Sequence, residues 1–191
     1  MGDLCGEITA DNLNNCLNPL QGGTEDEMIA LNKNDIDVIT RAADGFNVEN
    51  ITLKTGAKGF VIDGLKNSIS PSFASVEVGV FDRYEHTVNA KGFDISISAR
   101  NAVNGMTGGK YVVLTKNTYN GTDGDAKYVI HGLDQGLGFT VTRNPNDDTQ
   151  GAFDFTFATK VNKEPNIPAG LFITDEATTE AVWESLKVVA P

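Results

Sequence analysis

The chain has few of the residue types that metal sites and many active sites use. Its 191 residues include two cysteines and two histidines. Cys5 and Cys16 lie close together near the start, so a disulfide is one alternative, but two reduced thiols are the interpretation we favour. Zinc usually needs four ligands, and His86 and His131 are isolated in the sequence. The sequence therefore predicts no metal site and no cofactor.

Positive charge is also scarce. The chain has 15 Lys and Arg against 26 Asp and Glu, which gives a net charge of −11 at pH 7. The basic residues are scattered and form no run, whereas a surface that grips nucleic acid needs clustered Lys and Arg. An acidic surface can still line a path along which DNA passes without adhering, because like charges repel.

Long apolar runs are missing as well. No run approaches the length that spans a bilayer, so we expect no membrane partner. The first residues lack the basic start and apolar core of a signal peptide, and Gly6 stands where a myristoylation motif needs Ser or Thr. These absences favour a soluble protein made inside a cell.

Motifs for catalysis are not found. Gly105-Met-Thr-Gly-Gly-Lys110 departs from a phosphate-binding loop, because Asn104 replaces its first glycine and Tyr111 replaces the Ser or Thr that would hold magnesium. The chain has no Gly-x-Ser-x-Gly turn of a hydrolase. We predict that the protein is not an enzyme and has no catalytic residues.

One loop offers acidic residues for a metal. Asn120, Asp123 and Asp125 could gather around calcium after Tyr119, but their spacing does not match an EF-hand. Asn-Gly and Asp-Gly pairs are typical of hairpin turns. A structural turn is the interpretation that this pattern favours.

Alternation of apolar and polar residues dominates the chain, and it predicts β-strands. In 151–158, Phe153, Phe155 and Phe157 fall on one side of the strand. Residues 110–159 are expected to form a four-stranded meander, with strands at 110–116, 126–131, 137–142 and 151–158. Earlier strands are predicted at 27–32, 35–39, 47–53, 58–63, 72–82, 83–88 and 92–98.

Two of these segments have apolar residues at every second position. One face of 72–82 has Ala74, Val76, Val78 and Val80, and 92–98 is expected to point Phe93, Ile95 and Ile97 inward. The glycine-rich stretch 101–109 is interpreted as a connector with at most one helical turn.

The two ends of the chain differ from the middle. Residues 1–24 are rich in Asn and Gly and predict an extended arm, followed by a single β-rich domain over 25–191. One helix is predicted at about 175–189, capped by Thr174 or Asp175. Its apolar stripe is expected to have Trp183 beside it and to comprise Ala177, Ala181, Val182, Leu186 and Val189. The fold class is therefore mainly β, a sandwich or barrel with long hairpins and one C-terminal helix.

The order of these parts resembles bacteriophage tail-tube and tail-hub proteins. Segments similar to virion proteins of phages of gut Bacteroidetes, such as the crAss-like group, are Leu4-Cys-Gly6, Gly22-Gly-Thr-Glu-Asp26, and Gly151-Ala-Phe-Asp-Phe-Thr-Phe157 followed by Pro165 and Pro168. The resemblance implies a structural subunit of the virion, assembled in the host cytoplasm. It implies a hexameric ring of identical or related copies that contacts other tail or connector proteins.

The same resemblance implies how such a ring would work. Its lumen would be lined by long hairpins with negative charge, so that the genome slides through without specific contacts. Segments 47–66 and 73–98 are the candidates for that lining, and the arm 1–24 and the C-terminal helix would contact neighbouring subunits. The resemblance carries no catalytic residues.

Other classes of function stay open. A capsid decoration protein would share the β-rich architecture. A carbohydrate-binding β-sandwich would expose aromatic side chains on one face, but Tyr84, Tyr111, Tyr119, Tyr128 and Trp183 are dispersed in the sequence. An enzyme with an unusual site would need a pocket with perturbed carboxylates around one of the two histidines.

Overall fold

The computed structural model describes residues 22–65, 68–143 and 151–191. Most of the predicted arm and both cysteines lie outside the described residues. The first described strand begins at Thr24, three residues before the predicted start at Glu27.

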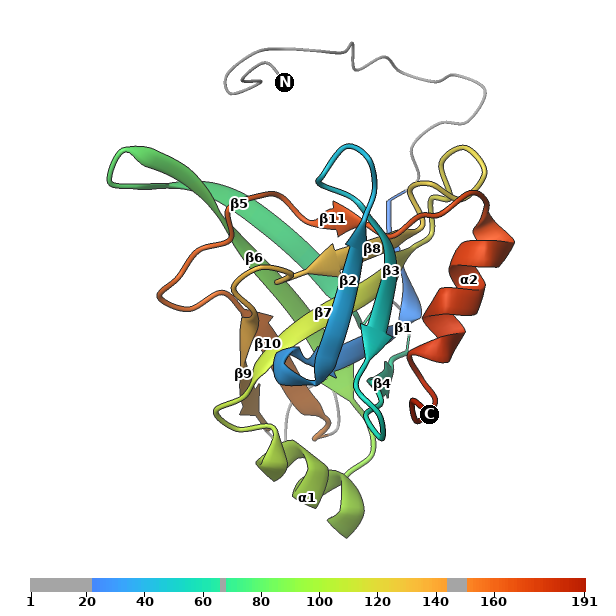
Figure 1. The fold of residues 1–191 in the computed structure, drawn as a ribbon. Helices are drawn as coiled ribbons and strands as arrows, with labels where there is room; N and C mark the ends of the chain where they lie inside the picture. Colours follow the sequence, from blue (N-terminus) through green and yellow to red (C-terminus); the bar gives the residue numbers. More distant parts are fainter. Residues whose placement is uncertain (1–21, 66–67, 144–150) are drawn as a thin grey trace.

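The described fold is mainly β, with two helices, as Figure 1 shows. The strands are β1 (Thr24–Asn32), β2 (Ile36–Arg41), β3 (Val48–Leu53), β4 (Phe60–Asp63), β5 (Ser70–Val78), β6 (Phe81–Gly92), β7 (Lys110–Asn117), β8 (Tyr128–His131), β9 (Leu137–Thr142), β10 (Phe153–Ala158) and β11 (Ala169–Gly170). The helices are α1 (Ile97–Gly105) and α2 (Glu176–Ser185), with a short 3-10 turn at Lys33–Asp35.

Nine of the strands form one antiparallel sheet, and β2 and β3 form a separate hairpin. The main path through the sheet runs β11-β8-β7-β9-β10-β6-β5, and β1 pairs with both β7 and β4. Across the described residues the sheet curls but does not close into a barrel. The predicted meander is wrong in its order, because β9 pairs with β7 and not with β8.

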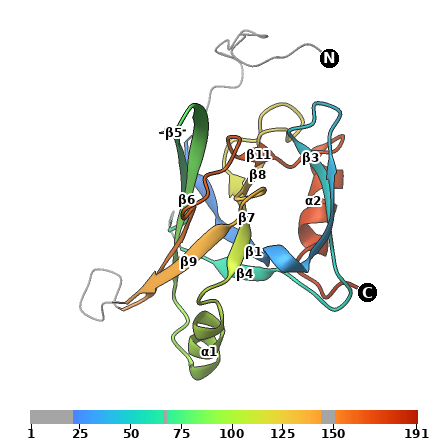
Figure 2. The ribbon, with the colours of Figure 1, turned by 60° about the vertical axis from the view of Figure 1, so that its left-hand side comes forward.

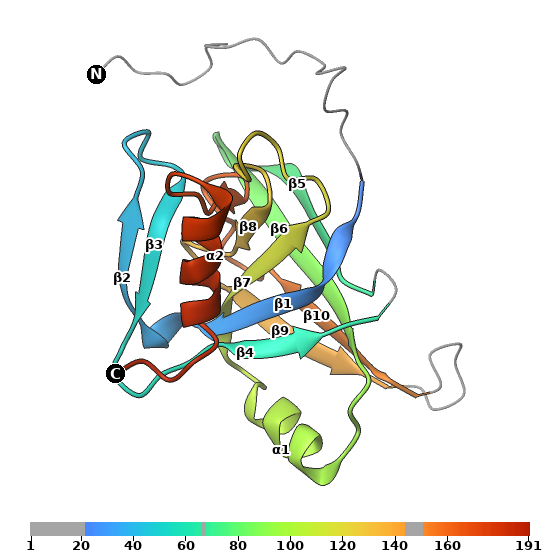
Figure 3. The same ribbon diagram turned by 90° about the vertical axis from the view of Figure 1, so that its right-hand side faces the viewer.

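Two apolar cores lie on opposite faces of β1 and β7. The helix-side core lies between these strands and the layer made of α2, β2 and β3 (Figure 3). The sheet-side core is enclosed by the curl of the sheet (Figure 2). Residues Val112 and Leu114 of β7 enter the first core, and Tyr111 and Val113 enter the second. The alternation of this one strand thus joins the two cores.

The predicted alternation of β10 is confirmed. Phe153, Phe155 and Phe157 are buried in the sheet-side core, and the residues between them are partly exposed. Phe157 makes ring contacts with Phe139 and Tyr111 at centroid distances of 5.1 and 5.7 Å. The aromatic side of this strand therefore forms the centre of the core.

The strand predicted at 92–98 is wrong. Helix α1 begins at Ile97, and Ser96 caps it by accepting a hydrogen bond from the backbone N–H of Ala99. Phe93, Ile95 and Ile97 are exposed, and Ile97 has 79% of its surface accessible. The alternation of these residues is real in the sequence, but no sheet covers them among the described residues. The expectation of at most one helical turn within 101–109 is also wrong, because α1 is longer than one turn.

The C-terminal helix is confirmed, and the predicted stripe is confirmed for Val182 and Leu186 but wrong for its other three residues. Asp175 caps α2 by accepting from the N–H of Thr178, and the helix ends at Ser185. Its buried residues are Thr179 and Trp183, followed by Leu186 at the C-cap. Ala177, Ala181 and Val189 are exposed. The face turns toward the indole of Trp183 because this side chain buries far more apolar area than an alanine does.

No helix of the described residues is long and apolar enough to cross a membrane.

Candidate functional site

The longest exposed feature of the fold is the β5–β6 hairpin. Its strands pair from Ser70 and Asn89 at the base to Val78 and Phe81 at the end. The turn residues are Gly79 and Val80, and Gly79 adopts φ 67°, the left-handed conformation that two-residue hairpin turns need at their first position. Figure 1 shows this hairpin reaching beyond the body of the molecule at the upper left.

The two halves of the hairpin have different surroundings. Residues 87–92 of β6 pair with β10, so the base of the hairpin belongs to the curled sheet. The outer half extends past β10, and its apolar side chains are exposed on both faces. Exposed fractions are 53% for Phe73, 90% for Val80 and 63% for Phe81. Surface of this kind is typical of an interaction site.

Strand β5 is also an open edge. Among the described residues it pairs with β6 alone, so the backbone groups along its other side pair with no strand. Proteins usually block such edges with charges, prolines or bulges, because an open edge adds a strand from another chain. In β5 these devices are limited to Pro71 and Glu77. The edge is nine residues long and is suited to pairing between molecules.

The hairpin tip, defined as residues 77–82, places two carboxylates together. Glu77 and Asp82 are cross-strand partners on the same face. Both are exposed, and neither forms an ion pair or a hydrogen bond within the described residues. Like charges directly opposite each other destabilise a strand pair. The tip therefore presents a small anionic surface with no counter-charge of its own.

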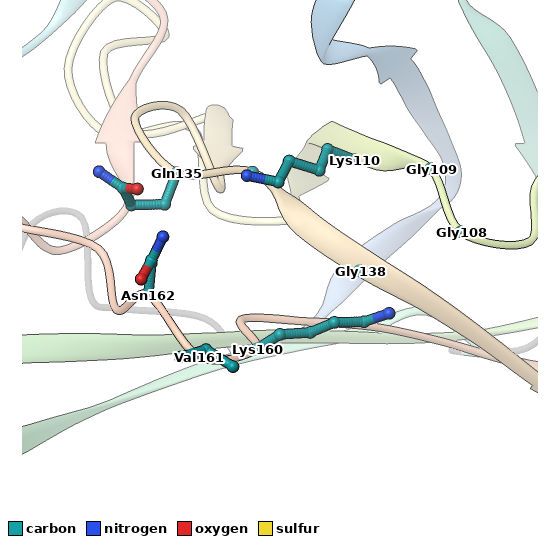
Figure 4. A pocket seen from close by; sticks show the side chains of 9 residues that line it. Gly108, Gly109, Lys110, Gln135, Gly138, Lys160, Val161 and Asn162 are labelled. Carbon is teal, nitrogen blue, oxygen red and sulfur yellow. The ribbon is translucent and has the colours of Figure 1, made fainter.

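A second exposed feature is a basic hollow, which we call the lysine pocket. It is defined by Lys110, Lys160, Gln135 and Asn162 around Gly108, Gly109, Gly136 and Gly138, and its volume is about 230 Å³. Figure 4 shows Lys110 extending toward Gln135, with Asn162 facing them and Lys160 running along Gly138. A side chain at position 138 would collide with the Lys160 chain, so glycine leaves the space that Lys160 occupies.

The lysines of this pocket are unusual in the chain. Within the described residues, Lys110 and Lys160 have no ion pair, hydrogen bond or ring contact. Lys33 also lies beside Gly136, and its Nζ donates to the carbonyl oxygens of Leu133 and Asp134 at 2.8 and 2.7 Å. Burial lowers the pKa of Lys33, the negative charges of Glu164 and Asp134 oppose that shift, and the charge of Lys110 adds to it. The region thus combines the charges of Lys33, Lys110 and Lys160 with those of Asp134 and Glu164.

The structure brings the two isolated histidines together. His86 and His131 form an edge-to-face pair with ring centroids 6.0 Å apart, and both are buried. Nδ1 of His86 accepts from the N–H of Gly132 at 3.1 Å, so Nε2 carries the proton that is donated to the carbonyl oxygen of Asn166 at 3.0 Å. Burial lowers the pKa of His86, and burial with the nearby His86 lowers the pKa of His131 to about 3.

Glu164 completes this buried cluster and was not singled out from the sequence. Glu164 is only 1% exposed, and its carboxylate accepts hydrogen bonds from the N–H groups of Asp134, Gln135 and Gly136 at 2.9 to 3.1 Å. Burial raises the pKa of Glu164, and the three N–H donors oppose that shift. The backbone of Glu164 exchanges two hydrogen bonds of 2.9 Å with Tyr84 of β6.

The cavity beside this cluster is small. It is lined by His86, Asp134, Glu164 and their neighbours and has a volume of about 10 Å³, close to the space for one water molecule. An enzyme with an unusual site would need a carboxylate with a shifted pKa, and Glu164 has one. However, each hydrogen bond that its carboxylate accepts comes from the backbone of the 132–136 turn. The cluster fastens the 132–136 turn and the segment after β10 to the outer half of the hairpin.

The acidic loop and the aromatic residues considered in the sequence analysis have structural roles. In the 120–125 loop, Asp125 accepts from the N–H of Thr122 at 2.8 Å, and Asp123 adopts φ 55°. No group of three His, Cys, Asp or Glu residues in the described parts of the chain is placed to hold a metal. Tyr111, Tyr128 and Trp183 are buried, so they form no exposed aromatic face.

One more apolar hollow lies at the far end of β6 from the hairpin tip. It has a volume of about 320 Å³ and is lined by side chains of β4, α1 and the residues after β6. Phe60, Val61 and Phe93 are partly exposed at its edge. The molecule thus has two different apolar surfaces at opposite ends of one strand.

Comparison with known proteins adds no family to these observations. No protein-family model, curated protein or solved structure matches this chain.

Proposed function

We propose that the protein acts by assembly rather than by catalysis, as a structural subunit that joins copies of itself into a ring or tube. The observation that carries this proposal is the open edge of β5 in a hairpin whose outer half is apolar on both faces. A second strand or a neighbouring surface would cover both at once.

The distribution of the exposed surfaces favours a ring or a tube over a two-fold dimer. The hairpin tip and the hollow beside α1 are different surfaces at opposite ends of β6. Contacts between two different surfaces repeat from copy to copy, and they close into rings or continue into tubes. Repeating contacts of this kind are what a tail-tube or tail-hub subunit, the phage virion role suggested by the resemblance in sequence, would need.

Charge and the position of the hairpin fit the same role. Of the two candidate lumen segments, 47–66 contributes Val48, Ile51 and Leu53 to the helix-side core, whereas 73–98 includes the exposed hairpin. With a net charge of −11, a lumen lined by this chain would repel DNA and let the genome pass.

The direct test is the mass of the purified full chain across a range of concentration. Sedimentation velocity and electron microscopy should show rings or tubes, and replacing Val80 and Phe81 by Ser should return the chain to monomers. Val188→Ser is the control, because Val188 is also exposed, at 61%, but lies beyond α2. A wild-type chain that stays monomeric at high concentration would contradict the proposal.

A further inference from the structure

The hairpin tip and the lysine pocket have opposite charges, and each lacks a partner. Glu77 and Asp82 face the same side of the tip, with β-carbons about 5 Å apart as in any directly opposed pair. Two adjacent carboxylates of this kind call for cations from outside the hairpin. The nearby Arg83 does not supply one, since its guanidinium lies 5.6 Å from the ring centroid of Phe81.

Among the described residues, basic side chains without a partner gather at the lysine pocket. Most of the described Lys and Arg side chains are engaged in ion pairs, hydrogen bonds or ring contacts, such as Lys116 with Glu180 and Lys91 with Asp154. The described basic residues with none of these contacts are Lys58, Lys110 and Lys160. Two of these three lie at the same hollow.

The size and lining of the hollow suit carboxylate side chains. Its volume of about 230 Å³ is below the range of about 300–1,000 Å³ that is typical of small-molecule sites. The glycines around it keep the entrance free of side chains, and the amides of Gln135 and Asn162 offer further donors. Figure 4 shows the two lysine side chains extending in opposite directions, so each carboxylate would meet one ammonium group and form a charge-assisted hydrogen bond with it.

The tip does not reach the pocket of its own molecule. No ion pair joins Glu77 or Asp82 to either lysine in the described structure. The tip projects beyond the body, whereas Lys160 lies along Gly138 of β9 (Figures 1 and 4). Charge complementarity between two separated surfaces of one chain fits a contact between two copies.

We infer that the hairpin tip of one copy docks on the lysine pocket of the next, with Glu77 and Asp82 facing Lys110 and Lys160. This contact rests on the proposed self-association and gives the hairpin tip the lysine pocket, rather than the hollow beside α1, as its partner surface. It joins two different patches, so it propagates from copy to copy. Val78 and Phe81 form the neighbouring cross-strand pair and therefore point to the opposite face of the hairpin from the two carboxylates.

A charge-swap experiment on the full chain tests the contact. One variant has Lys110→Glu with Lys160→Glu, a second has Glu77→Lys with Asp82→Lys, and a third combines all four changes. Each of the first two should weaken self-association, measured by sedimentation, by about tenfold or more, and the combined variant should recover most of the loss. Lys58→Glu, which reverses the remaining described lysine without a partner, should leave association unchanged.

The outcomes separate this contact from the proposed function. If wild type assembles but neither reversal weakens it, or if the combined variant recovers nothing, the contact is wrong and the assembly proposal stands. A wild type that never assembles overturns both. Circular dichroism and melting curves of each variant verify folding, and Lys110→Gln with Lys160→Gln provides a milder pair that should weaken association in the same direction.

A phosphate control identifies the other possible occupant. Inorganic phosphate, added at constant ionic strength, should weaken assembly of the wild type by competing for Lys110 and Lys160. If phosphate binds these lysines in the monomer and assembly does not respond, the pocket is a site for small anions and the docking contact is wrong.

Discussion

Strands β10 and β5 have similar sequence patterns but differ in burial. Both alternate apolar and polar residues, yet β10 buries every second side chain, whereas β5 has exposed residues on both faces over its outer half. Alternation decides which side chains share a face. Burial depends on whether another layer covers that face, and for β10 the layer is the rest of the curled sheet. No described part of the chain forms a layer over the outer half of β5.

The largest difference in the free energy of unfolding is expected between the substitution of a phenylalanine in β10 and that of a phenylalanine in β5. Phe157→Ala should lower the free energy of unfolding by about 3–5 kcal/mol, because it leaves a cavity in the sheet-side core. Phe73→Ala makes the same chemical change on the exposed hairpin and should cost much less. Urea unfolding followed by the fluorescence of Trp183 measures both. Equal losses would mean that the outer hairpin is covered in the free chain.

The next effect is expected at Glu164, which fastens the hairpin to the body. Glu164→Gln should cost about 1.5–3 kcal/mol of unfolding free energy, because an amide group then faces backbone N–H donors inside the protein. Glu85→Gln is the matched control, since Glu85 makes a surface ion pair with Lys163 that should contribute about 0–1 kcal/mol. Similar losses at both positions would contradict the fastening role.

The next expected effect is a change of stability with pH, which arises in the buried cluster of His86, His131 and Glu164. The pKa of His131 is lowered to about 3, whereas an unfolded histidine titrates near 6.5. Between these values the unfolded state binds more protons, so stability should fall as the pH drops below 6.5. The lowered pKa of His86 acts in the same direction. The raised pKa of Glu164 acts in the opposite direction, because its contribution is fully present below pH 4.5 and is lost as the pH rises.

Replacing His131 isolates its share of this pH dependence. His131→Leu should reduce the fall in unfolding free energy between pH 7 and pH 5, where one fully buried histidine accounts for about 2 kcal/mol. Unfolding midpoints in urea at several pH values measure the slope. An unchanged slope would show that His131 takes up its proton without unfolding.

The smallest effect on stability is expected at the hairpin tip. Val80→Ser should change the free energy of unfolding by no more than about 0.5 kcal/mol, because Val80 is 90% exposed. The same change should weaken self-association. Thermal melting at low concentration, where the chain is monomeric, separates the two effects. A large loss of stability in the monomer would assign the tip to the core of the fold.

The sequence predicted those elements whose partners are close or whose pattern is strong. Strands β7 and β10 and the cap at Asp175 were found because alternation and capping are local properties. Helix α1 was missed because Ile95 and Ile97 imitate a strand, although Ser96 is a good N-cap signal.

The candidate site was harder to predict. The hairpin lay within a segment proposed to line a lumen, but its exposure depends on where β10 ends beside it. Glu164 stands before a proline in a polar stretch, which is typical of a surface loop. Its burial depends on three N–H groups about 30 residues earlier in the chain. The lysine pocket likewise joins three segments that no sequence pattern links.

The place of β7 between the two cores has a consequence for how the molecule opens. Removing either core would expose the backbone hydrogen bonds that this strand makes with β1 and β8. Neither half can therefore melt while the other stays native, and the chain should unfold in one cooperative step. The amide hydrogens of Val112, Val113 and Leu114 should then exchange with deuterium more slowly than those of the hairpin.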